Sequence, residues 1–568
     1  MRVSRLFAVS VAGLASANPL PLALLGLAQN PGDLGSACRA DALGKTTAVR
    51  LLDVASELTL GLALHAVRLA GIAFLGHGAL LTYWVTPRKP RPVADTTSPA
   101  ETGRPHDRAL PGSQSPCAGV ARRILVEISD IFDISPKFRS MRPGTREWPI
   151  VTYPTIDPDT NRLLADLDTL LSMPSLGGTA AEVDIQRHLA KEWRSEGLVV
   201  DEWDIDLEQL TADQSFPGME VARAQAVGVT ATLAGTGGGQ SLLINGHTDV
   251  VPPGDRGAWS ADPFTPRLEQ RDGVDVIVGR GACDMKAGLV AGWAAVRAIA
   301  ASGISLRGDV IIAPVVGEED GGLGTFALLR HGVSADMCIV PEPTSLDLIP
   351  ANGGALTFRL IVRGAATHAS RRTEGVSAIE KFIPVMQAIE VYEAERNAEV
   401  DPLMARWPLA YPISIGTVHA GDWASTVPDL LTAEGRLGVA LDESIDDARS
   451  RLEQAVAAAC SRDPWLRDHP VEVQWWGGQF ASGRTDLAHP VITELGDIHR
   501  ELTGSDPLIY GGPYGSDLRL LSGLGGIPTV QYGPGDAARA HAPDEYVPID
   551  EVITCTRALI TMILRTCA

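Results

Sequence analysis

Basic residues are scarce in this 568-residue chain, which carries 48 lysines and arginines against 69 aspartates and glutamates and has a net charge of −21. A chain this acidic offers no basic stripe to neutralise phosphates, which argues against a nucleic-acid partner. The deficit is uneven, because the segment up to Glu147 has a net charge of +6 and the remainder one of −27. A mildly basic leader therefore precedes a strongly acidic body.

Cysteine is also scarce, and its positions are widely separated. The seven are Cys38, Cys117, Cys283, Cys338, Cys460, Cys555 and Cys567. An odd and scattered set forms neither a disulfide framework nor a zinc-finger pattern. We therefore expect the body of the protein to belong to a reducing compartment, the cytoplasm.

The first 147 residues differ from the rest and are interpreted as a poorly ordered or hydrophobic extension. The apolar run Leu6–Ala17 is typical of a signal peptide. Leu58–Val85 is long enough to span a bilayer, but Arg68 near its middle costs roughly 3 kcal/mol for insertion. Residues 87–116 have the composition of a disordered linker. We favour an unstructured extension or a mis-assigned translation start over a secretion leader or a membrane anchor.

Beyond this leader, strand-like apolar runs alternate with amphipathic helices, the clearest of them predicted over 287–301. Such alternation predicts an α/β fold with a mostly parallel sheet covered by helices. One stretch instead reads strand–helix–strand–strand–helix–strand, which is typical of a ferredoxin-like α+β sandwich. The sequence thus predicts one domain from residues 148–354 and 479–568, and a second domain, 355–478, inserted into it.

Four times between Leu242 and Glu342, a hydrophobic or glycine-rich segment ends and a carboxylate or imidazole follows directly. The strings are GHTDVVP (246–252), GRGACDMK (279–286), VGEEDGG (316–322) and PEPT (341–344). In an open α/β sheet, ligands bind at the carboxyl ends of the strands. We therefore expect these side chains to converge, and a metal site is the simplest chemistry that uses them.

A hydrolytic site with two metal ions needs a bridging carboxylate, terminal ligands on each ion, and a base that takes a proton from water. The candidate ligands are His247, Asp284, Glu319, Glu342 and, much later in the chain, His541. Oxygen and imidazole donors without a thiolate pair suit zinc, with cobalt and manganese as alternatives. Glu318 is left to act as the base, and Asp249 can accept the distal N–H of His247.

The strings GHTDVVP, GRGACDMKAG, GEEDGG, PEPT and HAPDEYVP, in this order, resemble the zinc-dependent aminoacylase, acetylornithine deacetylase and succinyl-diaminopimelate desuccinylase family. Glutamate carboxypeptidases and related dipeptidases share the pattern. The resemblance covers about 157–568 and includes the inserted domain. It implies that His247 and Glu342 bind one metal ion, that Glu319 and His541 bind the other, and that Asp284 bridges the two.

The resemblance also implies that Glu318 deprotonates the attacking water and passes the proton to the leaving amine. The inserted domain would be a lid or dimerisation domain. His368, in GAATHAS, would reach into the partner subunit's active site to stabilise the oxyanion, although it could instead only hydrogen-bond within its own loop. Arg436, in AEGRLG, would hold the substrate carboxylate, although it could instead pair with an acidic neighbour.

Three further residues are candidate substrate contacts. Gly515 and Ser516 resemble the glycine-rich substrate loop of the family. Ser425 stands where the family often has asparagine three residues before a proline, and this variant modestly favours acetylornithine-type chemistry over dipeptidase chemistry.

The sequence therefore predicts a homodimeric, dinuclear metal-dependent hydrolase that removes the acyl group from N-acyl amino acids. Two alternatives remain open: a metallo-exopeptidase that cleaves dipeptides or carboxy-terminal residues with the same site, and an inactive homologue that serves as a binding protein. The intact base and all five ligands argue against the second, because a binding module has no use for a base beside a metal ion.

Overall fold

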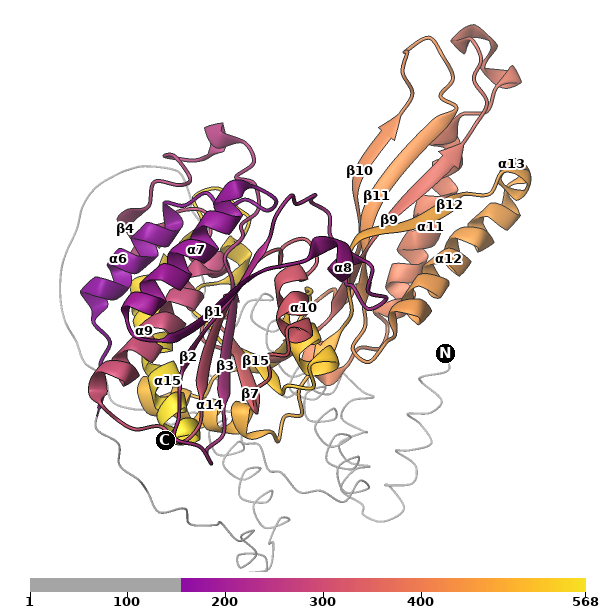
Figure 1. The fold of residues 1–568 in the computed structure, drawn as a ribbon. Helices are drawn as coiled ribbons and strands as arrows, with labels where there is room; N and C mark the ends of the chain where they lie inside the picture. The colour runs from indigo at the N-terminus through magenta and orange to yellow at the C-terminus, as the bar shows by residue number, and fades with distance from the viewer. Residues whose placement is uncertain (1–154) are drawn as a thin grey trace, which may run out of the picture. The chain divides into compact units, whose positions relative to one another are not determined.

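The computed structural model describes residues 155–568, which Figure 1 draws as a coloured ribbon. The predicted extension, its two apolar runs and the predicted boundary at residue 148 lie outside the described residues. Within 155–568, no helix combines the length and the apolar character that a bilayer crossing requires.

The larger domain is built on a nine-stranded sheet with the order β1-β2-β6-β3-β7-β15-β8-β13, and β14 pairs with β8. The strands are β1 (Val199–Asp204), β2 (Val227–Leu233), β3 (Leu242–His247), β6 (Val310–Val315), β7 (Met337–Val340), β8 (Leu348–Asn352), β13 (Gly483–Arg484), β14 (Ile509–Gly512) and β15 (Thr529–Gln531). The central strands β6, β3, β7 and β15 pair in parallel, whereas β1, β2, β8 and β13 add antiparallel pairs. The predicted α/β fold with a mostly parallel central sheet is confirmed.

Helices cover both faces of this sheet (Figure 1). They are α6 (Thr160–Leu171), α7 (Ala180–Ser195), α8 (Leu207–Thr211), α9 (Ala287–Ser302), α10 (Leu323–Arg330), α14 (Pro490–Thr503) and α15 (Ile549–Cys567). Leu242 and Ile244 of β3 pack into the core that contains α9, whereas Leu243 packs on the opposite face with Leu328 of α10. Because successive strand residues face opposite sides and both are covered, the first three residues of β3 are all apolar.

Shorter elements carry the loops around the site. A three-stranded sheet has the order β16 (Tyr546–Pro548), β5 (Val274–Val278) and β4 (Arg267–Arg271). The short helical turns are η2 (Arg256–Ala258), η3 (Ala282–Lys286), η4 (Ala369–Glu374), η5 (Pro402–Met404), η6 (Leu520–Leu524) and η7 (Ala537–Arg539). Pairing of β16 with β5 brings the segment before β16 beside the segment that leads into η3.

The inserted domain has its own sheet and its own core. Its elements are β9 (Gly354–Arg363), α11 (Ala378–Arg396), β10 (Ile413–Ala420), β11 (Leu430–Val439), α12 (Ile445–Arg462), α13 (Pro464–Asp468) and β12 (Glu472–Phe480). The strands are all antiparallel in the order β10-β11-β9-β12, and α11 and α12 pack on the sheet in one core. This order is that of the predicted ferredoxin-like α+β domain.

Candidate active site

Three neighbouring parallel strands end at the same edge of the large sheet, and a polar residue marks each end. β3 ends at His247, β6 is followed by Glu318 and Glu319, and β7 is followed by Glu342. These strands lie side by side in the order β6-β3-β7. The rule that ligands bind at the carboxyl edge of a parallel sheet therefore places their side chains in one region.

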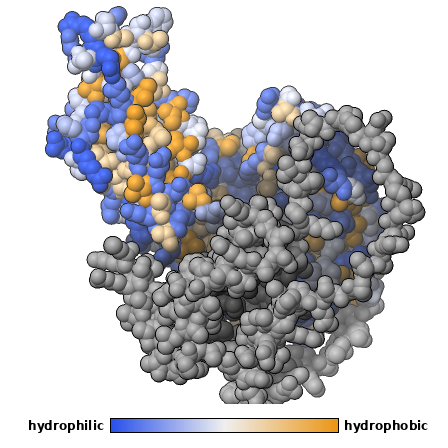
Figure 2. All heavy atoms as spheres, turned by 180° about the vertical axis from the view of Figure 1, so that it is seen from behind, coloured by the Kyte–Doolittle hydropathy of each residue, from blue (hydrophilic) through white to orange (hydrophobic). Residues whose placement is uncertain are grey.

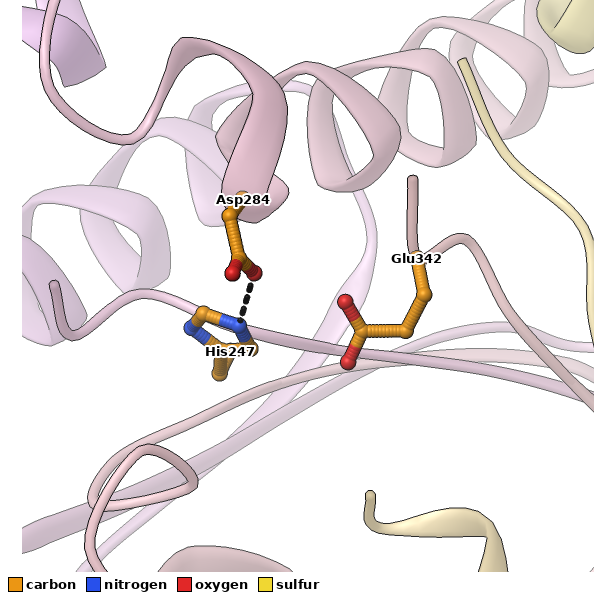
Figure 3. A group of neighbouring side chains, drawn as sticks. All are labelled: His247, Asp284 and Glu342. Carbon is orange, nitrogen blue, oxygen red and sulfur yellow. Dashed lines mark hydrogen bonds and ion pairs between the residues drawn. The ribbon is translucent and has the colours of Figure 1, made fainter. Parts of the chain in front are cut away.

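The five predicted ligands form two groups that share one carboxylate. His247, Asp284 and Glu342 make the first group, and Asp284, Glu319 and His541 the second; within each group the candidate ligand atoms lie within 4.8 Å of one another. Figure 3 shows Asp284 pointing at the His247 ring, with Glu342 turned toward the same space. The distances from Asp284 to His247 Nε2 and to His541 Nε2 are 3.0 and 3.4 Å. This grouping is the one that the resemblance implies, and metal binding by it stays a prediction.

Asp249 accepts the distal N–H of His247, as predicted, and it does so through its main-chain carbonyl oxygen. The Nδ1 atom of His247 donates to the Asp249 carbonyl oxygen at 2.9 Å, whereas the Asp249 carboxylate lies 3.8 Å away. That carboxylate instead accepts the backbone N–H groups of Glu318 and Glu319 at 3.3 and 3.2 Å. Because a carbonyl can only accept, Nδ1 carries the proton and Nε2 faces Asp284. Asp249 thus also holds the loop that carries the predicted base.

Carboxylates crowd this site and are largely buried. Burial raises the pKa of Glu319 and that of Glu342, and the negative charge of Asp284 raises both further. Burial also raises the pKa of Glu318 well above its ordinary value. Buried like charges are costly unless a cation compensates them. A divalent cation in each group would supply that compensation.

The two histidines provide the nearest positive charge. Hydrogen bonds to Asp284 and Glu319 raise the pKa of His541 to about 10. Burial alone would lower the pKa of His247, but the hydrogen bond to Asp284 and the negative charges of Glu342, Asp284 and Asp249 together outweigh it and raise this pKa well above its usual value. The same bonds hold the pKa of Asp284 below its usual range in spite of burial. A set of two imidazoles and three carboxylates, with no thiolate, fits zinc or a similar divalent ion.

Glu318 differs from the ligands because it belongs to neither of the two ligand groups. The side chain is 8% exposed, and among the described residues no hydrogen bond to its carboxylate is found. It lines a cavity of about 220 Å³ together with Asp284, Glu319, Glu342 and His541. A carboxylate facing both groups has the geometry of a general base.

Asp320, the third acid of the run, has a structural partner that the sequence did not reveal. Its carboxylate accepts from Arg223 at 2.8 and 2.9 Å, and Arg223 also pairs with Glu182 of α7 at 2.9 Å. The Arg223 side chain is fully buried. This buried network anchors the loop that presents Glu318.

Glu545 is a second residue that sequence reasoning missed. Its carboxylate accepts the backbone N–H groups of Cys283 and Asp284 at 2.8 and 3.0 Å, and it pairs with buried Arg280 at 2.6 Å. It therefore fixes the turn that carries the shared carboxylate. The available signal was its place four residues after His541, in the string HAPDEYVP.

Comparison with known proteins agrees with this geometry. The family described as Peptidase family M20/M25/M40 matches residues 243–565. The chain belongs to this family. It is accordingly a hydrolase of amide bonds, and the family resemblance stated from the sequence is confirmed.

Relatives of known activity include two kinds of deacylase. The chain is 29% identical over 438 residues to the N-formyl-4-amino-5-aminomethyl-2-methylpyrimidine deformylase of Halalkalibacterium halodurans, covering 72% of this chain and 96% of that protein. It is 30% identical over 330 residues to the succinyl-diaminopimelate desuccinylase of Gluconacetobacter diazotrophicus, covering 56% and 79%. An M20 family metallo-carboxypeptidase of Sulfolobus solfataricus shares the fold, with a TM-score of 0.57, 17% identity, and coverage of 70% and 98%.

In this M20 chain, the predicted substrate residue Arg436 lines a second cavity of about 420 Å³, next to Glu318, Glu319 and His541. It is not free, because its guanidinium donates to Glu220 at 2.8 Å. Arg436 therefore pairs with an acidic neighbour, which is the alternative raised from the sequence. Because it also lines the cavity, its guanidinium is still accessible to a substrate.

Of the two loop residues predicted to contact substrate, Gly515 lines the two cavities described above and Ser516 lines neither. Gly515 lines both cavities, and a Cβ atom at this position would lie 2.6 Å from Phe480. Ser516 is 1% exposed, and its hydroxyl contacts Asn352 at 3.3 Å and accepts from Gln531. Its side chain therefore faces the interior of the domain, which corrects the prediction of a substrate contact.

His368 and Ser425 lie together on the inserted domain. The backbone N–H of Ala369 donates to the Ser425 carbonyl at 2.8 Å, and the exposed His368 ring bonds to the Ser370 hydroxyl at 2.8 Å. Neither residue is among those that line the two cavities. The observed partner of the His368 ring is therefore Ser370 in the same loop. The predicted role of His368 across a subunit interface stays a prediction.

Proposed function

We propose that this chain is a dinuclear metal-dependent deacylase that hydrolyses the linear amide bond of a small N-acylated amine. The observation that carries the proposal is the buried Glu318 carboxylate in one cavity with both ligand groups. N-acyl amino acids, including substrates of the acetylornithine type, are the candidates that the sequence suggests. The named relatives remove formyl and succinyl groups from amines, which supports acyl removal.

Two divalent ions, zinc or alternatively cobalt or manganese, would be held by His247 with Glu342 and by Glu319 with His541, with Asp284 shared. Bound there, they would supply water activation and polarisation of the amide carbonyl. Glu318 takes the proton from the attacking water and delivers it to the leaving nitrogen. Asp249 holds the Glu318 backbone, so the base stays within the cavity.

We also propose that the enzyme acts as a homodimer through its inserted domain. Ile379, Ile383 and Met386 of α11 are between 40% and 52% exposed and lie at helical spacing. Figure 2 shows hydrophobic surface on this domain, at the upper left. A second copy would cover this stripe, and the family resemblance implies that His368 of the partner subunit then stabilises the oxyanion. The five cysteines of residues 155–568 are free and buried, which supports a reducing, cytoplasmic location.

The test is hydrolysis by the full-length, metal-loaded protein. N-formyl, N-acetyl and N-succinyl amino acids and amines, including N-acetylornithine, are compared with unblocked dipeptides, and the released amine is quantified. We expect turnover of N-acyl substrates and a mass of two chains in light scattering. Turnover of dipeptides alone would replace the proposal with an exopeptidase. Metal binding without any turnover, or a single-chain mass, would contradict the deacylase or the dimer respectively.

A further inference from the structure

Arg436 is the natural anchor for a negatively charged substrate group, and its environment shows how strong an anchor it is. Apart from His541, it is the only basic side chain among the described residues that line the 420 Å³ cavity. Glu318, Glu319 and His541, which also line it, belong to the catalytic groups, and the rest of the wall is uncharged and includes Phe480, Tyr514 and Pro412. Outside the catalytic groups, the guanidinium of Arg436 is therefore the one charge on the wall of this cavity that a substrate carboxylate would meet.

Glu220 neutralises that guanidinium from a fixed position. Its Oε1 atom accepts from Arg436 at 2.8 Å, from the Thr357 hydroxyl at 2.9 Å and from the Gly478 N–H at 3.4 Å. Its own backbone N–H donates to Asp320 at 3.0 Å. Three donors at one oxygen and an anchored main chain hold Glu220 against Arg436. The side chains are 26% and 41% exposed, so a substrate can still approach the pair.

We infer that Glu220 is a specificity-determining residue, which makes this site prefer N-acylated amines with an uncharged end over those with a free carboxylate. The inference rests on the proposed function, since it concerns the substrate of the same site. A substrate carboxylate that approaches Arg436 meets an ion pair whose net charge is zero. The Glu220 carboxylate is already hydrogen-bonded to the same guanidinium and repels the substrate carboxylate. Attraction to one partner is then offset by repulsion from the other. An uncharged end meets no such repulsion and packs on the aromatic and proline walls.

The experiment compares substrates that differ only in this charge. N-formyl- and N-acetyl-phenylalanine are each paired with their carboxamide, and deacylation is followed by mass spectrometry. Wild type should have the higher kcat/KM on the carboxamides. Glu220→Gln, which leaves Arg436 charged, should shift the ratio about threefold to fivefold toward the carboxylates, mainly through KM, as expected for one partly exposed ion contact.

Matched variants separate this effect from structural damage. Glu434→Gln breaks the pair with Arg359 on the same sheet, where the two side chains lie 2.6 Å apart, and should leave the ratio unchanged. The double variant Glu220→Gln, Arg436→Gln should not show the shift in the kcat/KM ratio toward the carboxylate substrates. A ratio that stays within about twofold of wild type in Glu220→Gln, or an equal loss on both members of a pair, would overturn the inference.

Binding is measured separately from hydrolysis, by calorimetry on two metal-loaded proteins: Glu318→Gln alone, and Glu318→Gln combined with Glu220→Gln. The quantity compared is the ratio of Kd values for the carboxylate and the carboxamide. If wild type hydrolyses neither substrate, the proposed function fails. An unshifted Kd ratio between carboxylate and carboxamide would overturn the role of Glu220, whatever the hydrolysis shows.

Discussion

Replacing Glu318 with glutamine should reduce kcat by about 10³-fold, within the range of about 10² to 10⁴ that general-base catalysis contributes. The substitution keeps the size of the side chain and removes only its ability to take a proton. Because Glu318 belongs to neither ligand group, metal content should stay at the wild-type level. Removing one of several crowded carboxylates also leaves the fold no less stable. The measurements are kcat on the best N-acyl substrate, metal content by mass spectrometry, and Tm.

Glu196→Gln is the matched control for this experiment. Glu196 accepts from Trp293 and Arg297 at 2.8 Å, and it lines neither cavity. The same loss of charge there should leave kcat unchanged. Turnover that survives in Glu318→Gln at full metal content would show that another group accepts the proton, and the assignment of the base would be wrong.

Replacing Asp284 with asparagine should remove metal binding at both groups, because both share this carboxylate. The expected loss in kcat/KM is about 10³-fold or more, since metal ions supply several kcal/mol of transition-state stabilisation and each tenfold corresponds to about 1.4 kcal/mol. Binding also stabilises the folded state, by about 4 kcal/mol at a thousandfold excess of metal over Kd. Wild type should therefore show a metal-dependent rise in Tm that the variant lacks.

The apoprotein separates this outcome from misfolding. Without metal, Asp284→Asn should unfold at a temperature close to that of wild type, because it gives up its contacts with the two histidines but also relieves repulsion with Glu319 and Glu342. Asp166→Asn is the control, since Asp166 is 6% exposed and pairs with Arg297 at 2.7 Å, away from both cavities. It should lower Tm while metal content stays unchanged. Full metal content in Asp284→Asn would contradict the shared-ligand arrangement.

The ligand groups could be predicted because each residue follows a local signal. His247, Glu319 and Glu342 come at or just after parallel strands, and the geometry of such sheets alone brings them together. The ferredoxin-like domain could be predicted for the same reason, because its strands and helices follow one another along the chain and each has its own local pattern. Asp249 was predicted as the acceptor for His247, but the sequence could not specify which of its oxygen atoms accepts, because turn geometry decides whether a carbonyl or a carboxylate faces the ring.

The buried charge pairs could not be predicted from local patterns. Arg223 lies 41 residues from Glu182 and 97 from Asp320, and Glu220 lies 216 residues from Arg436. Nothing in the strings around these residues specifies their partners. For Ser516, the sequence identified the family-like loop but not the direction of the side chain. The hydroxyl points toward Asn352 and Gln531, which come from other parts of the chain.

The central claim is that two metal ions, one in each group, are required for amide hydrolysis. Full-length protein is stripped with a chelator, and zinc, cobalt or manganese is added back in steps while metal content and N-acyl hydrolysis are measured on the same samples. We expect no activity in the stripped protein and recovery that is complete at two equivalents per chain. Hydrolysis that persists after the metal is removed, or two bound equivalents without recovery of turnover, would contradict the account.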